Sequence, residues 1–420
     1  MHTFRHPRAR AFLLLTALFT ESLAAGDPAD TWIDLPPLPV GRQEVGVAAL
    51  GTDVYVVGGI LPDRSATGRV ARFDTITEEW ETLAPLPGNT RLHHIGCAAA
   101  GDKLYAVGGL DRSFRGVATV FAYDPDTDRW TGVASLLRAR GASGVATLEG
   151  RIYAVGGQSG GTLFRDAEVY DPDEDSWAEL PPMPTARNHL AAAGLDGHLF
   201  AISGRAAGLR AAVESFDPDT LQWTTRSAIP TARGGIAAAV LAGKIFVFGG
   251  EGNTRDPRGV FHEVESYHPP SDTWQRRPDM PRPRHGIGAA AVGDRIYIPG
   301  GAPVQGFGTT DVHDALTPDE LVVEGPVFRR GDANGDHAVD VSDPVFILTR
   351  LFLHGQGFEC EDAADADDNG AIELTDGIVV LDYLFRGAQP PPAPGPVIEG
   401  NDPTDDELRT CEGNPRQARD

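Results

Sequence analysis

Apolar residues recur along the chain in short runs that each end in a glycine doublet. Residues 47–57 (VAALGTDVYVV) show the pattern: two apolar stretches flank a Gly-Thr-Asp turn, and Gly58-Gly59 follows. Most of these positions are apolar on both faces, which predicts inner strands that are covered on both sides. The doublet recurs as Gly108-Gly109, Gly156-Gly157, Ser203-Gly204, Gly249-Gly250 and Gly300-Gly301.

An aromatic residue follows five of the doublets, and a tryptophan stands seven positions after it. The pairs are Phe73–Trp80, Tyr123–Trp130, Tyr170–Trp177, Phe216–Trp223 and Tyr267–Trp274. Each pair predicts a third and a fourth strand, joined by a turn rich in acidic residues. Successive tryptophans, starting at Trp32, are 46 to 51 residues apart, a period typical of β-propellers.

The repeat resembles the kelch repeat over residues 30–323, and this resemblance implies an all-β propeller of four-stranded blades. Trp32 has no aromatic partner before it, whereas Gly300-Gly301 has no tryptophan after it. The simplest solution is a strand containing Trp32 that completes the last blade. Closure of this kind leaves no open sheet edge. We therefore expect a six-bladed kelch propeller over residues 26–323 that the N-terminal strand closes.

A ring of polar residues precedes the inner strands. Its members are Arg42, Glu44, Arg91, His93, His94, Arg140, Arg187, His189, Arg233, Arg284 and His285. One interpretation is a channel-mouth site for an anionic or sugar ligand, because arginine offers a planar fork of donors. The other is that the repeated arginines bind backbone carbonyls and hold the blades together. We favour the second interpretation for the arginines and regard the non-repeated histidines as the better specificity residues. Local spacing gives no support for a metal cluster among them.

Enzymatic kelch-like families are less well matched. Galactose-oxidase-type enzymes need a tyrosine–cysteine cofactor and copper ligands, yet Cys97 is the sole propeller cysteine and has no copper motif around it. Exported kelch sugar mutarotases use Arg and Glu near the channel, which Glu44 and the arginines make conceivable. We expect a non-catalytic propeller that binds protein or glycan, and keep a carbohydrate-active enzyme of mutarotase or oxidase type as the alternative.

Two acidic segments of the C-terminal region carry oxygen-bearing side chains at loop positions 1, 3, 5, 9 and 12. This spacing wraps the hard oxygen ligands of calcium around one ion, with a backbone carbonyl at position 7. We expect two calcium ions. The predicted ligands are Asp332, Asn334, Asp336, Ala338, Asp340 and Asp343 in the first loop, and Asp365, Asp367, Asn369, Ala371, Glu373 and Asp376 in the second. Apolar helices are predicted at 345–353 and 378–385.

Both loops end in Asp, and no helix is predicted before the first one, so residues 331–387 resemble a type I dockerin. The resemblance implies a cohesin-like partner in a polysaccharide-related system, bound through loop positions 10 and 11. Those positions are Val341, Ser342, Leu374 and Thr375. A self-contained calcium-stabilised module without a partner is the alternative. His337 departs from the usual glycine at position 6, so the first site is expected to be weaker.

The remaining segments suggest export. Residues 1–25 have a basic, then apolar, then small-residue order typical of a secretory signal, and no later run is long enough to span a membrane. We expect a secreted, cell-surface or periplasmic protein. Cys360 and Cys411 then predict a disulfide. The net charge of −24 disfavours nucleic acid binding. A linker (324–330) and a Pro-rich acidic tail (388–420) complete the organisation.

Overall fold

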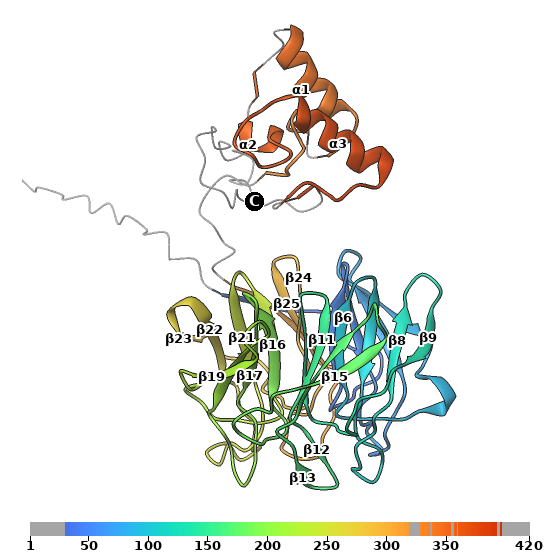
Figure 1. The fold of residues 1–420 in the computed structure, drawn as a ribbon, viewed down its shortest axis with the longest axis vertical. Coiled ribbons are helices and arrows are strands. Elements are labelled where there is room, and N and C mark those ends of the chain that lie inside the picture. Colours follow the sequence, from blue (N-terminus) through green and yellow to red (C-terminus); the bar gives the residue numbers. More distant parts are fainter. Residues whose placement is uncertain are drawn as a thin grey trace, which may run out of the picture.

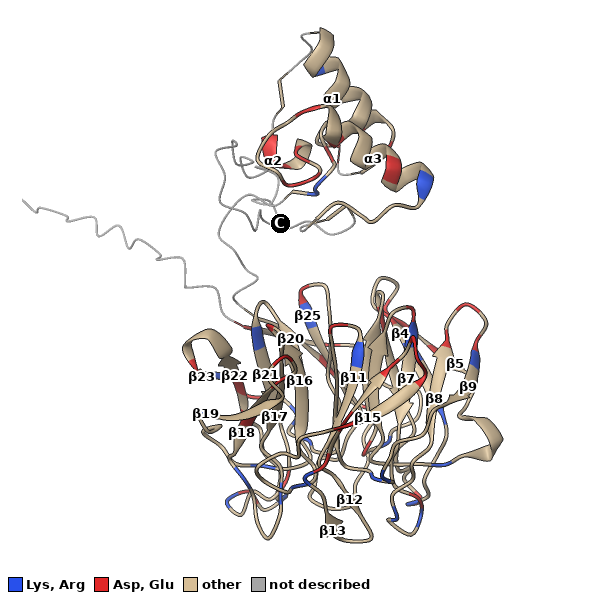
Figure 2. Ribbon diagram, in the orientation of Figure 1, with Lys and Arg blue, Asp and Glu red and all other residues tan. Residues whose placement is uncertain are grey.

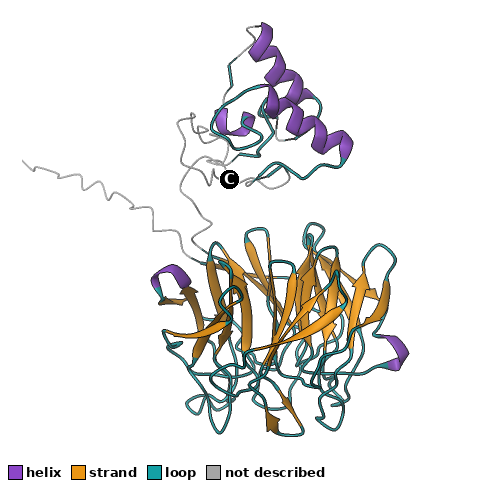
Figure 3. Cartoon of the chain, in the orientation of Figure 1, coloured by secondary structure: helices purple, strands orange, loops and turns teal. Residues whose placement is uncertain are grey.

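A computed structural model describes residues 30–318, 328–336, 338–353, 357–358, 360–392 and 395–396. The predicted signal (1–25), residues 324–327 of the linker, His337 and Cys411 lie outside the described residues. Strands dominate one part of the described chain, which also has two short 3-10 helices at Pro87–Asn89 and Pro269–Ser271, and helices dominate the other (Figure 1, Figure 3).

The first part is a β-propeller of six four-stranded antiparallel sheets. Blade 1 contains β2 (Gly46–Leu50), β3 (Asp53–Val57), β4 (Val70–Asp74) and β5 (Glu79–Leu83); blade 2 contains β6 (Gly96–Ala100), β7 (Lys103–Val107), β8 (Val120–Asp124) and β9 (Arg129–Val133). Blade 3 contains β10 (Gly144–Leu148), β11 (Arg151–Val155), β14 (Ala167–Asp171) and β15 (Ser176–Leu180), with the small hairpin β12 (Gln158–Ser159) and β13 (Thr162–Leu163) in its loop.

Blade 4 contains β16 (Ala191–Leu195), β17 (His198–Ile202), β18 (Val213–Asp217) and β19 (Gln222–Arg226); blade 5 contains β20 (Ala237–Leu241), β21 (Lys244–Phe248), β22 (Val264–His268) and β23 (Thr273–Arg277). Blade 6 contains β24 (Ala290–Val292), β25 (Arg295–Pro299), β26 (His313–Thr317) and, as its outer strand, β1 (Thr31–Asp34). Trp32 pairs with Leu316, so the N-terminal strand closes the propeller as the repeat predicts.

Apolar side chains pack between neighbouring blades and form six separate core clusters. The tryptophans add a polar contact at every one of these junctions, because each indole Nε1 donates to a backbone carbonyl of the preceding blade's outer segment. The acceptors are Pro278 for Trp32, Pro36 for Trp80, Ala84 for Trp130, Ala134 for Trp177, Pro181 for Trp223 and Ser227 for Trp274. The repeated tryptophan therefore connects blades as well as filling the space between them.

The second part contains α1 (Ser342–Leu353), a short α2 (Glu361–Ala364) and α3 (Leu374–Arg386). Both long helices begin three to four residues earlier than their apolar runs indicate. In α3 the reason is a capping box, in which Glu373 and Asp376 bond each other's backbone N–H. Loop ends therefore form the first helical turns. Among the described residues, no helix has the length and apolar character needed to cross a membrane.

Candidate functional site

Six residues before the inner strands form a closed ring of backbone hydrogen bonds around the propeller axis. Each has left-handed backbone dihedrals, and each donates its N–H to the equivalent carbonyl of the preceding blade. Around the ring they are Glu44, His94, Ala142, His189, Gly235 and Gly286. The ring satisfies the backbone N–H and the carbonyl of each of these six residues.

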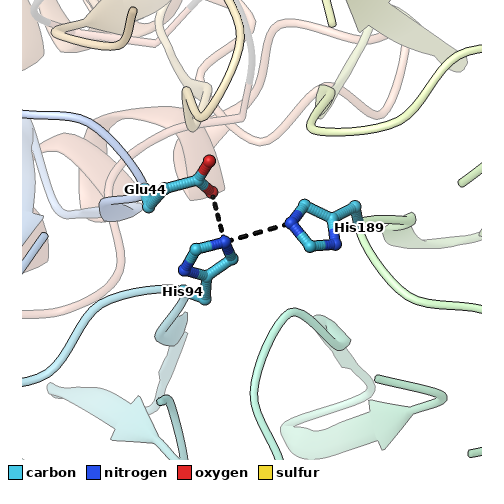
Figure 4. A group of neighbouring side chains, drawn as sticks. All are labelled: Glu44, His94 and His189. Atoms are coloured by element: carbon cyan, nitrogen blue, oxygen red, sulfur yellow. Dashed lines mark hydrogen bonds and ion pairs between the residues drawn. The ribbon is translucent and has the colours of Figure 1, made fainter. Parts of the chain in front are cut away.

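Three side chains of this ring converge (Figure 4). His94 Nε2 lies 3.2 Å from Glu44 Oε2 and 3.0 Å from His189 Nε2, and all three groups are buried or nearly so. His285 Nδ1 lies 3.6 Å from the other oxygen of Glu44. His93 stands one step behind, with its Nδ1 bonded to Nδ1 of His94. The structure thus gathers Glu44, His94, His189 and His285 and sets His93 behind them.

Burial governs the protonation of this cluster. It lowers the pKa of His94 and holds the pKa of His189 well below its usual value, so burial disfavours the charged form of both rings. Burial also lowers the pKa of His93 to about 4. For Glu44 the burial effect would raise the pKa, but the surrounding histidines outweigh it and hold the pKa well below the usual range. The same carboxylate raises the pKa of His285 against the effect of burial.

Two further charged residues border the cluster, and sequence reasoning missed both. Arg205 Nη2 lies 2.7 Å from His189 Nε2, and Arg205 Nη1 lies 2.5 Å from Glu251 Oε1. Each directly follows a repeat doublet, where its backbone pairs with the segment before the inner strand. The equivalent residues in the other blades are Ile60, Leu110, Gln158 and Ala302. Charged residues at this repeated position were the signal that could have identified them.

Five of the predicted arginines are fully buried and bonded to the framework. Arg187 donates to the carbonyls of Thr185 and Ala201 and to Glu214 Oε2 at 2.6 Å. Arg140, Arg233 and Arg284 repeat this arrangement with Glu168, Glu265 and Asp314. Burial lowers the pKa of all four, and the carboxylates partly offset the effect. These side chains bind carbonyls rather than face a ligand space.

Blades 1 and 2 depart from this arrangement. Arg42 bonds the carbonyls of Val40 and Val56 but has Ala71 where blades 3 to 6 place a carboxylate, and burial lowers its pKa to about 10. Arg91, predicted as a ring member, is instead exposed and bonds Asn89. Leu92 occupies the buried ring position and packs in one core cluster with Phe121, so blade 2 replaces the ion pair by an apolar pair.

The space at the axis is small. Glu44, His94 and His189 line a cavity of about 100 Å³, together with the apolar residues that follow them. Two larger hollows lie between the loops of neighbouring blades, one beside Arg91 and one beside Arg255. Pockets for drug-sized ligands typically enclose about 300–1,000 Å³. The axial cavity therefore has room for an ion or a few waters rather than for a sugar.

The C-terminal part brings most of the predicted calcium ligands into two matching loops, where acidic residues gather (Figure 2). Asp343 accepts the N–H groups of Asn334 and Asp340, and its counterpart Asp376 accepts those of Asp367 and Glu373. Likewise, Asp332 and Asp365 each accept two amides of their own loop. The two loops share one fold at an offset of 33 residues.

Buried carboxylates lie close together in these loops. Burial raises the pKa of Asp343 and of Asp376 to about 6, and nearby carboxylates add to the effect. Asp365, Asp367 and Asp376 each place a carboxylate oxygen within 4.8 Å of the others. Asp367 Oδ1 is buried without a hydrogen-bond partner. Hard oxygen donors held this closely fit a calcium ion.

Both long helices expose an apolar stripe with the same spacing. Val345 and Phe352 on α1 correspond to Ile378 and Phe385 on α3, and all four side chains are exposed. The predicted partner-contact residues Val341, Ser342, Leu374 and Thr375 continue the stripes at the loop ends and are also exposed. Cys360 is disulfide-bonded, while Cys97 is a free thiol whose pKa burial raises to about 12.

Comparisons with known proteins agree with the propeller. Residues 32–204 match a family model described as the KLHDC2/KLHL20/DRC7 Kelch-repeats domain, and residues 232–281 match the Kelch motif. Kelch-like protein terF of Aspergillus terreus is 41% identical over 70 residues, which cover 17% of this chain and 15% of that protein. The chain thus spans far less than two thirds of this relative.

A solved structure, that of YjhT, superimposes with a TM-score of 0.58 at 17% identity. The match covers 66% of this chain and 95% of that one. At this identity the likeness shows the fold alone. The chain therefore contains kelch repeats that fold into a six-bladed β-propeller.

Proposed function

We propose that this kelch-repeat chain is a non-catalytic recognition protein with two binding parts. Its propeller binds a protein or glycan partner through its loops, and its C-terminal part is a dockerin-like module that binds two calcium ions and attaches to a cohesin-like protein. The observation that carries the proposal is the duplication within the C-terminal part. Loop hydrogen bonds, buried carboxylates and exposed apolar residues all recur at the same offset of 33 residues.

Calcium explains why the module tolerates so many buried carboxylates. Asp343, Asp365 and Asp376 are fully buried, and the raised pKa of Asp343 and Asp376 shows that their ionised forms are disfavoured without a cation. A bound calcium ion would offset this repulsion and couple metal binding to folding. The described residues of the module form two small apolar clusters, which supports such a dependence.

The exposed stripes favour a protein partner. Val341, Val345 and Phe352 follow one helical face at intervals of four and seven residues, and their counterparts on α3 do the same. Contiguous exposed apolar patches commonly mark protein–protein interaction sites. Because the faces are equivalent, one partner could bind in either of two orientations. A disulfide-bonded Cys360 supports an oxidising, extracytoplasmic location for this attachment.

The alternative of a carbohydrate-active enzyme has less support. Glu44 and Glu251 are carboxylates near the axis, but the cavity beside Glu44 is about 100 Å³ and the ring arginines are used by the framework. A sugar would need a larger open space there. Turnover of sugar anomers by the full chain that is lost in a Glu44→Gln variant would nevertheless establish this alternative.

Calcium and partner binding can be tested on the full chain. Calorimetry in excess calcium and in EGTA should show a transition of the C-terminal part that calcium shifts upward. Asp376→Asn should lower that transition, whereas Asp382→Asn, on the same helix but outside the loop, should not. Identical melting in calcium and EGTA would refute the calcium part of the proposal.

Binding to a panel of immobilised cohesin domains tests the partner. Val345→Glu and Ile378→Glu should each leave binding measurable, because the other face remains, and the double variant should lose it. Leu137→Glu, an exposed apolar position of the propeller, is the matched control. Two results would contradict the proposed attachment: cohesin binding by the double variant, or no binding of the wild-type chain to any cohesin domain tested.

A further inference from the structure

We propose that the propeller axis holds a divalent transition-metal site formed by Glu44, His94 and His189. This site is separate from the calcium loops and does not depend on the recognition function. It rests on how hydrogen bonds fix the histidine tautomers, on the spacing of the three ligand atoms and on the size of the cavity.

Hydrogen bonds determine which nitrogen of each ring carries the proton. His93 Nε2 lies 3.0 Å from the carbonyl of Asp111 and must donate to it, so His93 Nδ1 is an acceptor. His94 Nδ1 therefore donates to His93, which leaves a lone pair on His94 Nε2. In the same way His189 Nδ1 donates to Asn188 Oδ1 at 3.0 Å and leaves a lone pair on His189 Nε2. Arg205 supports this tautomer because it donates to the same nitrogen.

Three acceptors consequently face one another. His94 Nε2 points at His189 Nε2 and at the Glu44 carboxylate without a proton between the two rings. Buried lone pairs in this arrangement repel one another unless a cation lies among them. Asn188 and His93 act as the outer partners that commonly orient metal-bound imidazoles. The neutral imidazole is the form of histidine that binds metal.

Distances fit a metal of the zinc type. Four tetrahedral ligands at about 2.0–2.1 Å from zinc stand about 3.3 Å apart. The observed separations of 3.2 Å and 3.0 Å require only a small outward movement of the rings. Two imidazoles and one carboxylate leave a further position open for water. A cavity of about 100 Å³ has room for that water.

Arg205 is the competing group. Its guanidinium occupies the His189 lone pair, so a metal must displace it. The Arg205 side chain is one third exposed and keeps its contact with Glu251, so it can swing away while remaining paired. We expect Arg205→Gln to strengthen metal binding.

The site can be tested on the full-length protein. Saturating calcium is added to occupy the proposed sites in the C-terminal loops. Titration with zinc, and with cobalt as a spectroscopic probe, should reveal one equivalent per chain and visible cobalt absorption bands. His94→Ala and His189→Ala should weaken binding by more than about 100-fold. Both variants are compatible with the ring backbone, because Ala142 adopts the same left-handed conformation in blade 3.

His198→Ala, at the start of β17, is the control and should bind as the wild type does. Absence of zinc and cobalt uptake by the wild-type chain would overturn the proposal whatever the variants do. Uptake that His94→Ala and His189→Ala leave unchanged would also overturn it, since the metal would then be held elsewhere.

Discussion

Replacing one buried arginine should lower the free energy of unfolding much more in a blade that has a carboxylate partner for it than in a blade that lacks one. Arg187→Leu would leave Glu214 buried and unpaired, with only Thr185 still bonded to it. Breaking a buried ion pair in this way costs about 3–5 kcal/mol. Arg42→Leu removes bonds to two carbonyls and strands no carboxylate, so its cost should be about 1–3 kcal/mol.

The chain itself provides the rescue design. Blade 2 has Leu92 and Phe121 at the positions of Arg187 and Glu214. We therefore expect Arg187→Leu/Glu214→Phe to recover at least about 2 kcal/mol relative to Arg187→Leu, because no buried charge remains. Urea unfolding in saturating calcium, followed by tryptophan fluorescence, reports on the propeller, which contains all six tryptophans.

Two results would refute this reasoning. A double variant no more stable than Arg187→Leu would show that the stranded carboxylate is not the main cost. Equal losses for Arg42→Leu and Arg187→Leu would show that the carbonyl bonds dominate. Either outcome would contradict the view that these arginines stabilise the propeller mainly by pairing with buried carboxylates.

Two further predictions concern contacts between blades. Burial among Phe73, Trp80 and Tyr297 lowers the pKa of His313 to about 4, so the unfolded chain takes up a proton first as the pH falls below about 6.5. Stability should thus drop by about 2–3 kcal/mol between pH 7 and pH 4.5. In urea titrations at pH 7 and pH 4.5, His313→Gln should lose this drop in the free energy of unfolding, whereas His198→Gln should keep it. An unchanged pH dependence in His313→Gln would count against a buried neutral His313. Trp223→Phe loses an indole bond of 2.8 Å and should cost about 1 kcal/mol, whereas Trp32→Phe loses one of 3.4 Å and should cost less; the reverse order in the same unfolding assay would contradict the role of the indole contact.

The sequence specified the fold well because the repeat carries its own register. Trp32 without a preceding aromatic residue and Gly300-Gly301 without a following tryptophan are two halves of one blade, and β1 pairs with β26 accordingly. The regular spacing of acidic residues likewise predicted equivalent positions for Asp343 and Asp376, which accept matching backbone amides. Helix starts were less accurate, because capping by Glu373 and Asp376 draws the loop end into α3.

Site details were harder to predict because they depend on single-residue register and on ring closure. Arg91 looks like a ring arginine, but a shift of one residue puts Leu92 at the buried position. Convergence of Glu44, His94 and His189 requires left-handed backbone at each and a ring of bonds that spans the whole propeller. No local pattern encodes either feature. Arg205 and Glu251 reach the axis from a different repeated position.

Calcium stoichiometry tests the central claim most directly. Full-length protein freed of metal and titrated with calcium in a calorimeter should bind two ions per chain. Asp376→Asn should reduce this to one ion, and the Asp382→Asn control should retain two. A wild-type chain that binds no calcium, or an Asp376→Asn variant that still binds two ions with unchanged affinity, would contradict the account.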